Sequence, residues 1–113
     1  MRVIRAVVAL SFVLGLALAP ASAGERLSSN AIKNLFPGQF HAVVKGYRVV
    51  FTAKSDGSLK GSYLASSDTG RWSVRRGRLC IMLKEWMEGK TSCSTVVHND
   101  GWYRAEKVKF RKL

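Results

Sequence analysis

The sequence predicts an all-β protein: an antiparallel up-and-down meander of seven or eight short strands, rolled into a small barrel or strongly curved sheet, with one short N-terminal helix. Three observations predict it. After Gly38, short runs rich in Val, Tyr, Phe, Trp and Thr alternate apolar and polar residues. Turn residues separate these runs at intervals of roughly 8–12 residues. The connections are too short for parallel crossovers, so neighbouring strands must be antiparallel.

The start of the chain has the three zones of a secretory signal peptide. Arg2 and Arg5 supply a positive segment, residues 6–19 are almost entirely apolar, and Pro20–Ala23 offers the small residues that a signal peptidase needs. The alternative, a membrane anchor, would need roughly 20 apolar residues to span a bilayer. We therefore expect cleavage after the last of these small residues, which makes 1–23 the signal and leaves 24–113 as a single periplasmic or secreted β domain.

The predicted mature domain is strongly basic. The chain has 19 Lys and Arg, of which Arg2 and Arg5 leave with the signal, so 17 remain against 7 acidic residues and the net charge is +10. Such a field favours anionic partners. Outside the cytoplasm these are anionic lipid, lipopolysaccharide or acidic polysaccharide, and no nucleic acid is expected. The alternative, that the charge only keeps the protein soluble, stays open.

One helix is predicted over residues 29–36. A serine cap precedes Ile32, Leu35 and Phe36, which have helical spacing, and Pro37-Gly38 ends the helix. A helix this short is not stable alone in water. We therefore expect its apolar side to pack on the sheet.

Eight strands are expected after the helix, joined by short turns. The strands are predicted at 39–45, 47–54, 58–65, 71–75, 78–84, 91–98, 102–105 and 107–111. The turns are predicted at 45–46, 55–57, 66–70, 76–77, 85–89 and 99–101. Asp-Gly and Asn-Asp-Gly provide the positive φ angles that tight hairpins require.

Alternation divides the strands into an apolar face and a charged face. The predicted inner residues are Phe40, Ala42, Val44, Tyr47, Val49, Phe51, Leu59, Gly61, Tyr63, Trp72, Val74, Leu79, Ile81, Leu83, Val108 and Phe110. A sheet with one apolar face should curl around it. An eight-stranded barrel is just filled by its own side chains, so we expect no large cavity, and a carrier of a small apolar ligand is not favoured.

The two cysteines are predicted to form a disulfide. In the hairpin between the strands at 78–84 and 91–98, the register places Cys80 directly opposite Cys93. An even number of cysteines in an exported domain also favours a disulfide. The alternative is a metal site, but it would need two more ligands, and His41 and His98 lack the usual spacing. No metal or cofactor is expected.

The sequence contains no signature of a catalytic site. It lacks a nucleophile elbow, a phosphate-binding loop and the zinc-protease motif. Glu85 and Glu88 flank a hairpin tip, where carboxylates are exposed and untuned. Asp56, Asp68 and Asp100 lie in or beside predicted turns, which explains them as turn formers. We therefore expect a protein that is not an enzyme.

Basic residues supply the candidate anion site. Arginine binds phosphate and carboxylate groups through two-point contacts, so a cluster of arginines favours anion binding. One group surrounds a tight turn and another follows the last strand. The candidates are Arg71, Arg75, Arg76, Arg78, Lys107, Lys109 and Arg111. The alternative for the lysines is that they only protect an edge strand from aggregation.

Trp86 and Met87 are candidates for an exposed apolar tip. They lie at the end of the hairpin that the disulfide closes. An apolar pair on such a loop suits insertion into a membrane interface or a partner's pocket. The alternative is that the tip folds back and covers the mouth of the barrel.

Several motifs resemble those of a known family. They are Gly70-Arg71-Trp72, Gly77-Arg78-Leu79-Cys80, Cys93 and Asp100-Gly101-Trp102-Tyr103. The pattern resembles a family of small secreted alphaproteobacterial proteins classed as a domain of unknown function. The resemblance implies a lipocalin-like β fold and a location in the envelope, and it supplies no catalytic residues. A looser similarity links the Trp and Cys pair to small periplasmic barrels that inhibit secreted metalloproteases, although 24–28 does not match their inhibitory segment.

These observations lead to two hypotheses of function. The first is an exported, non-enzymatic envelope protein that binds an anionic surface or polymer through a basic face. The alternative is a small periplasmic barrel that inhibits a secreted protease. That alternative requires a flexible segment at Gly24–Arg26, before the helix, that enters an active-site cleft.

Overall fold

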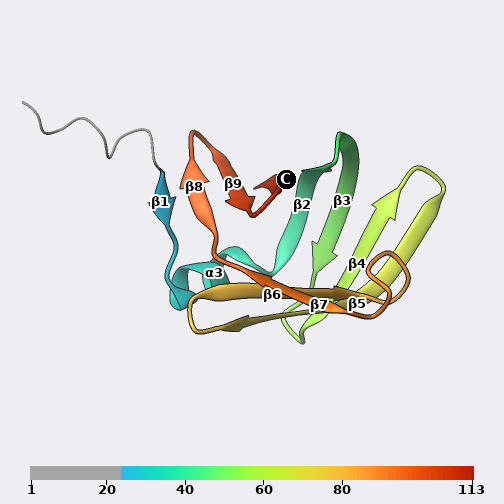
Figure 1. Cartoon of the computed structure of the whole chain (residues 1–113), viewed down its shortest axis with the longest axis horizontal. Coiled ribbons are helices and arrows are strands. Elements are labelled where there is room, and N and C mark those ends of the chain that lie inside the picture. The colour runs from blue at the N-terminus through green and yellow to red at the C-terminus, as the bar shows by residue number, and fades with distance from the viewer. Residues whose placement is uncertain (1–23) are drawn as a thin grey trace, which may run out of the picture.

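The computed structural model describes residues 24–113, which form one curled sheet and a short helix (Figure 1). The predicted signal peptide lies outside the described residues. In chain order the elements are β1 (Glu25–Arg26), α3 (Ser29–Leu35), β2 (Gly38–Val44), β3 (Tyr47–Ala53), β4 (Ser58–Tyr63), β5 (Ser66–Arg75), β6 (Arg78–Leu83), β7 (Thr91–Ser94), β8 (Val97–Asn99), β9 (Trp102–Ala105) and β10 (Val108–Lys112). The predicted fold class is confirmed. No helix within 24–113 is long and apolar enough to cross a membrane.

The sheet is a meander whose last strand, β10, returns to pair with β2. The order is β1-β8-β9-β10-β2-β3-β4-β5-β6-β7, with every pairing antiparallel. Because β10 pairs with β2, two strands far apart in the sequence lie side by side in the middle of the sheet, whereas β1 lies at its edge beside β8. β7 pairs with β6, whereas β8 pairs with β9. Only Thr95 and Val96 separate β7 from β8, so this bent segment joins the two sides of the curl.

The sheet has ten strands rather than the seven or eight expected, for two reasons. The segment 91–98, expected as one strand, bends and divides into β7 and β8 because its two halves pair with opposite sides of the sheet. The second reason is β1, in which Glu25 and Arg26 pair with His98 and Val97. Two residues carry too little periodicity to predict such a strand.

One predicted turn is wrong. Residues 66–70 were expected to form a turn, but they belong to β5, and the tight turn lies at Leu64 and Ala65 instead. Leu64 has a φ of 54° and is 87 % exposed. Ser, Asp, Thr and Gly are typical turn residues. Here Asp68 is buried and makes tertiary hydrogen bonds, which override that local preference.

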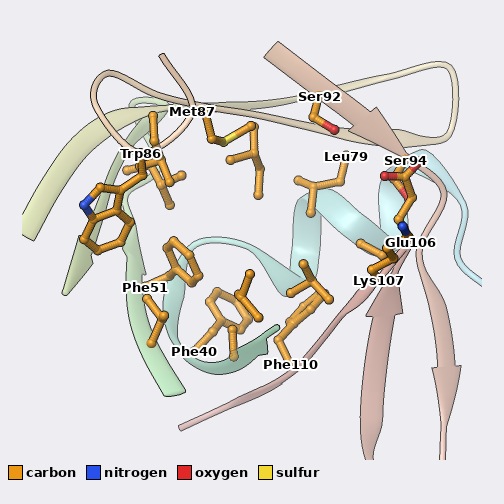
Figure 2. Close-up of a pocket in the computed structure, with 18 of the residues that line it drawn as sticks. Phe40, Phe51, Leu79, Trp86, Met87, Ser92, Ser94, Glu106, Lys107 and Phe110 are labelled. Atoms are coloured by element: carbon orange, nitrogen blue, oxygen red, sulfur yellow. The ribbon is translucent and has the colours of Figure 1, made fainter. Parts of the chain in front are cut away.

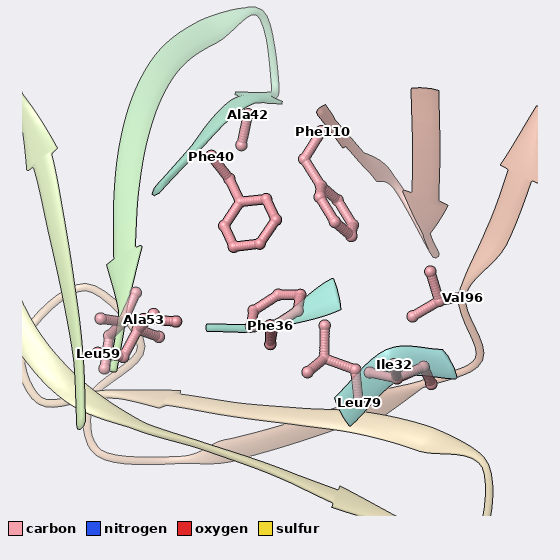
Figure 3. Close-up of a cluster of buried hydrophobic side chains, with 10 residues drawn as sticks. Ile32, Phe36, Phe40, Ala42, Ala53, Leu59, Leu79, Val96 and Phe110 are labelled. Atoms are coloured by element: carbon pink, nitrogen blue, oxygen red, sulfur yellow. The ribbon is translucent and has the colours of Figure 1, made fainter. Parts of the chain in front are cut away.

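The helix packs its apolar side on the core, as expected. Ser28 caps it by accepting a hydrogen bond from the Ala31 amide. Ile32 is fully buried, and Phe36 directly follows the helix (Figure 3). The Phe36 ring stacks on Phe40 with 4.5 Å between centroids. Helix and sheet therefore share one hydrophobic core.

The predicted inner face is largely confirmed. Phe40, Val49, Leu59 and other members of the set are buried. The exception is Tyr47, which is 56 % exposed. It begins β3 beside a turn, where the curl of the sheet no longer covers it.

The predicted disulfide is confirmed. Cys80 and Cys93 are bonded, and the register places them directly opposite each other, with Cα atoms 4.0 Å apart. Cys80 is buried. The bond fastens β7 to β6, and β6 is the only strand with which β7 pairs in the described sheet.

Candidate functional site

The inner face of the sheet encloses an apolar cavity of about 300 Å³ (Figure 2). The expectation of a barrel filled by its own side chains was therefore wrong. Large rings line the cavity, including Phe40 and Phe110, but three inner positions hold the small residues Ala42, Ala105 and Ser94. Small side chains at inner positions leave space that the neighbouring rings do not fill.

The Trp86–Met87 tip lies over this cavity. Both side chains line it, and Figure 2 shows them together at one side. Trp86 packs against Gly61, where a Cβ would lie 2.7 Å from the indole ring. The indole is nevertheless 37 % exposed. The tip therefore contacts the rim of the cavity and keeps part of the indole in solvent.

Asp68 holds this tip in place. Its Oδ2 accepts hydrogen bonds from the amides of Glu85 and Trp86 at 2.9 and 2.8 Å, and its Oδ1 accepts one from Thr69 at 2.8 Å. Burial raises the pKa of Asp68, but the hydrogen bonds from Trp86, Glu85 and Thr69 together outweigh it, so the pKa lies below its ordinary value. The sequence analysis missed this role, because local sequence shows Asp68 only as a turn former.

The outer face of the sheet is free of carboxylates. Of the residues in strands β2 to β10, only Asp68 is acidic, and it is buried. Within 24–113 the one ion pair joins Lys90 and Glu88, both on the loop after β6. The cations on the outer strands are therefore not neutralised by this chain.

Cations gather around one tryptophan on this outer face. The ammonium of Lys109 lies 4.8 Å from the centre of the Trp102 ring, and the guanidinium of Arg111 lies 4.9 Å from it. His41 lies 6.2 Å away between ring centroids. The register places Arg104 opposite Lys109, and Arg48 opposite the neighbouring Val43. We call this group the outer basic patch; its members are His41, Arg48, Trp102, Arg104, Lys109 and Arg111.

The structure divides the predicted anion-binding residues between separate places. Lys109 and Arg111 belong to the outer basic patch, whereas Lys107 lines the cavity. The arginines of β5 and β6 lie apart from them, because β2, β3 and β4 stand between β10 and β5. Arg75 faces Arg78 across the β5–β6 hairpin.

One of the predicted residues also serves the fold, and another lies beside a contact that does. Arg71 donates a hydrogen bond to the Asp56 carbonyl at 3.1 Å and packs over Gly57. Arg76 belongs to a turn that the helix secures, because the Gly77 amide donates to the Ser29 hydroxyl at 2.6 Å. Arg71 therefore stabilises a connection between elements in addition to carrying charge.

The sequence analysis did not select Trp102, Arg104, His41 or Arg48 for the site. Tyr103 stacks on Phe110 inside the sheet. Because successive side chains of a strand point to opposite faces, its neighbours Trp102 and Arg104 must lie on the outer face. Their proximity to β2 and β3 depends on the β10–β2 pairing, which joins strands far apart in the sequence and has no local signal. No group of three or more His, Cys, Asp or Glu within 24–113 could hold a metal ion.

Comparisons of the chain with protein-family models, with curated proteins and with solved structures found no match. The resemblance to the secreted alphaproteobacterial family therefore stays a prediction.

Proposed function

We propose that the protein is an exported, non-enzymatic binding protein of the cell envelope, which engages an anionic surface or polymer through the outer basic patch. The observation that carries this proposal is the Trp102 ring with Lys109 and Arg111 beside it. Export is supported by the signal-like pattern of residues 1–23 and by the disulfide, a bond that persists in oxidising compartments.

The patch has the groups that an anionic head group or acidic sugar requires. Lys109 and Arg111 present charged donors at a spacing fixed by β10, and a phosphate or carboxylate placed between them accepts from both. The indole offers a flat apolar surface to the uncharged part of the same ligand. Arg104 and Arg48 extend the positive field across three neighbouring strand pairs.

Charge segregation supports the same proposal. Carboxylates among the outer cations would neutralise them, but strands β2 to β10 expose none. The field of a domain with net charge +10 speeds encounter with anions. The alternative of a protease inhibitor has less support, since Glu25 and Arg26 pair with β8 instead of forming a free segment.

Flotation with lipid vesicles tests the proposal. We expect the protein to float with vesicles that contain phosphatidylglycerol and not with phosphatidylcholine alone. Binding should fall steeply as salt is added, because exposed charges are screened within about 8 Å at physiological ionic strength. Alginate is tested in parallel as the acidic polysaccharide.

A pair of double variants separates the patch from overall charge. Lys109→Glu with Arg111→Glu should weaken binding by about tenfold or more. Arg75→Glu with Arg78→Glu makes the same change in net charge on the other hairpin and should weaken it much less. Equal losses in the two variants, or binding that does not depend on salt, would refute the role of the patch.

A further inference from the structure

The cavity inside the sheet opens beside β7, which is one of the two edge strands of the described sheet. β7 pairs with β6 only, because the chain bends at Thr95 and Val96 before β8 joins β9. Ser92 and Ser94 of β7 line the cavity, and so do Glu106 and Lys107 of the turn between β9 and β10. Ser92, Glu106 and Lys107 are exposed, so the cavity reaches solvent on this side.

The interior of the cavity is apolar. Only four of its lining residues are polar, namely Ser92, Ser94, Glu106 and Lys107. The rest are aliphatic or aromatic, with Phe40, Phe51 and Phe110 facing the space in Figure 2. Water gains few hydrogen bonds in such a space, whereas a hydrocarbon placed there leaves water. The interior therefore suits an alkyl or other apolar group.

The polar groups gather away from the tryptophan tip. Figure 2 shows Ser94, Glu106 and Lys107 at one side of the cavity and Trp86 with Met87 at the other. Lys107 makes no ion pair with a residue of the described chain, the adjacent Glu106 included. A ligand here would have one end in apolar surroundings and the other beside the Lys107 ammonium and the Ser92 hydroxyl.

The charge of the domain selects the sign of that polar end. A cationic head group would meet the repulsion of a net charge of +10, whereas an anionic one is attracted. Lys107 supplies a positive charge at the mouth, and the Ser92 hydroxyl can donate to the same anion, whereas the Ser94 hydroxyl already donates to the Thr95 carbonyl at 2.9 Å. The Glu106 carboxylate also lies at this mouth and opposes an anion, but the adjacent Lys107 offsets it and the net charge of the domain then decides, so an anionic head group fits better than a cationic one.

The volume limits the size of the apolar part. About 300 Å³ is at the lower end of the range for pockets that enclose a small molecule. One hydrocarbon chain of medium length suits this space, and a lipid with two long chains exceeds it.

We propose that the cavity binds a single-chain anionic amphiphile, with its tail among Phe40, Phe51 and Phe110 and its head group at Lys107. This site is separate from the outer basic patch, because Lys107 lines the cavity while Lys109 lies over Trp102 on the outer face. The protein then has two sites for anionic molecules, one for a surface or polymer and one for a single chain.

Calorimetric titration of the purified, delipidated protein with dodecanoate tests this proposal. We expect saturable binding of one dodecanoate per protein. Lys107→Met should weaken it by about tenfold, because a charge-assisted contact is lost. Lys60→Met, at an exposed residue of β4 that belongs neither to the cavity nor to the outer basic patch, is the matched control with the same change in charge and should leave dodecanoate affinity unchanged. Equal effects of the two variants, or no binding by the wild type, would overturn the proposal.

Three further measurements locate the tail and identify the head group. Ser92→Trp should block the mouth and abolish binding; its melting temperature is measured beside that of the wild type, so that loss of fold is recognised. Methyl dodecanoate lacks the charge and should bind wild type and Lys107→Met equally. Dodecyl phosphate replaces the carboxylate by the phosphate that a single-chain phospholipid carries, and the tighter of the two anions indicates the source of the ligand. Undiminished dodecanoate binding by a folded Ser92→Trp variant would place the ligand elsewhere and refute the proposal.

Discussion

Neighbouring residues of β10 face two different environments. Phe110 is buried and lines the cavity, where it meets Phe40 edge-on with ring centroids 5.7 Å apart. Lys109 and Arg111, on either side of it in sequence, lie outside over Trp102. A single strand thus contributes to an apolar interior and to a basic exterior. The comparison shows how period-two alternation gives a small domain two surfaces of opposite chemistry.

The same comparison extends to the whole sheet. The acidic residues of the described chain, apart from the buried Asp68 and Glu25 in β1, lie in turns or loops. The interior has no charged side chain except at its mouth, at Glu106 and Lys107. Stability should therefore depend on the inner residues, and binding to anionic surfaces on the outer ones.

The largest effect is expected from truncating an inner residue of β10. Phe110→Ala should lower the free energy of unfolding by about 3–5 kcal/mol, because a buried ring is replaced by empty space. Arg111→Ala, its exposed neighbour, should change it by no more than about 0.5 kcal/mol. Urea denaturation measures both. Similar losses of unfolding free energy in the two variants would contradict the claim that the inner residues of β10 stabilise the fold and the outer ones do not.

Loss of the disulfide should come next. Cys80→Ser frees β7 from its covalent link to β6 and should lower the free energy of unfolding by about 3 kcal/mol. For a domain of this size the melting temperature should fall by more than about 10 °C. The measurement is a thermal melt with and without reductant. If the oxidised wild type and Cys80→Ser melt at the same temperature, the disulfide has no stabilising role.

Asp68→Asn tests whether the Asp68 carboxylate holds the Trp86–Met87 tip in place. The variant keeps the shape of the side chain but loses the charge that accepts three backbone amides, so we expect the melting temperature at neutral pH to fall by several degrees. The fluorescence of Trp86 should shift toward that of an exposed indole. Asp56→Asn, at an exposed turn, serves as the control and should leave the tip unchanged.

The difference in melting temperature between wild type and Asp68→Asn should depend on pH, because the pKa of Asp68 is lowered in the folded protein. The carboxylate stabilises the fold fully above its ordinary pKa of 3.8, and this contribution is lost as the pH falls below that value through the lower pKa of the folded state. The melting temperatures of wild type and Asp68→Asn should therefore converge as the pH falls below about 4. Other carboxylates titrate in both proteins and cancel from the difference. A difference that is constant down to acid pH would contradict the assignment.

The smallest effect on stability is expected at the centre of the outer basic patch. Trp102→Ala should change the free energy of unfolding by less than about 1 kcal/mol, because the ring is only partly buried. It should nevertheless weaken binding to anionic vesicles severalfold, since the ring orders Lys109 and Arg111. A large loss of stability with unchanged vesicle binding would make the ring a structural element alone.

The sequence predicted the fold class, the helix, the disulfide and most of the inner face, since each depends on local periodicity or on a register that one hairpin determines. It did not predict the bend at Thr95, because pairing with opposite sides of the sheet is a property of the closed structure. Asp68 was placed in a turn for the same reason: its partners, Glu85 and Trp86, come from another loop.

The binding sites were predicted only in part. The basic residues of β10 were selected, but their grouping with Trp102 and His41 depends on two strand pairings that the sequence does not specify. The cavity was not expected, because an estimate from strand number assumes inner residues of average size. Ala42, Ala105 and Ser94 are smaller than average, and the unpaired side of β7 gives the space an opening.

A salt series on the wild-type protein tests the central claim most directly, that the two faces of one sheet bind by different forces. The affinities for phosphatidylglycerol vesicles and for dodecanoate are measured side by side from low to high sodium chloride. Vesicle binding should fall by orders of magnitude, since exposed charges are screened. Dodecanoate binding should change by no more than about threefold, because burial of its chain supplies most of the free energy. Parallel falls in the two affinities would mean that both ligands use the same exposed charges and would contradict the account.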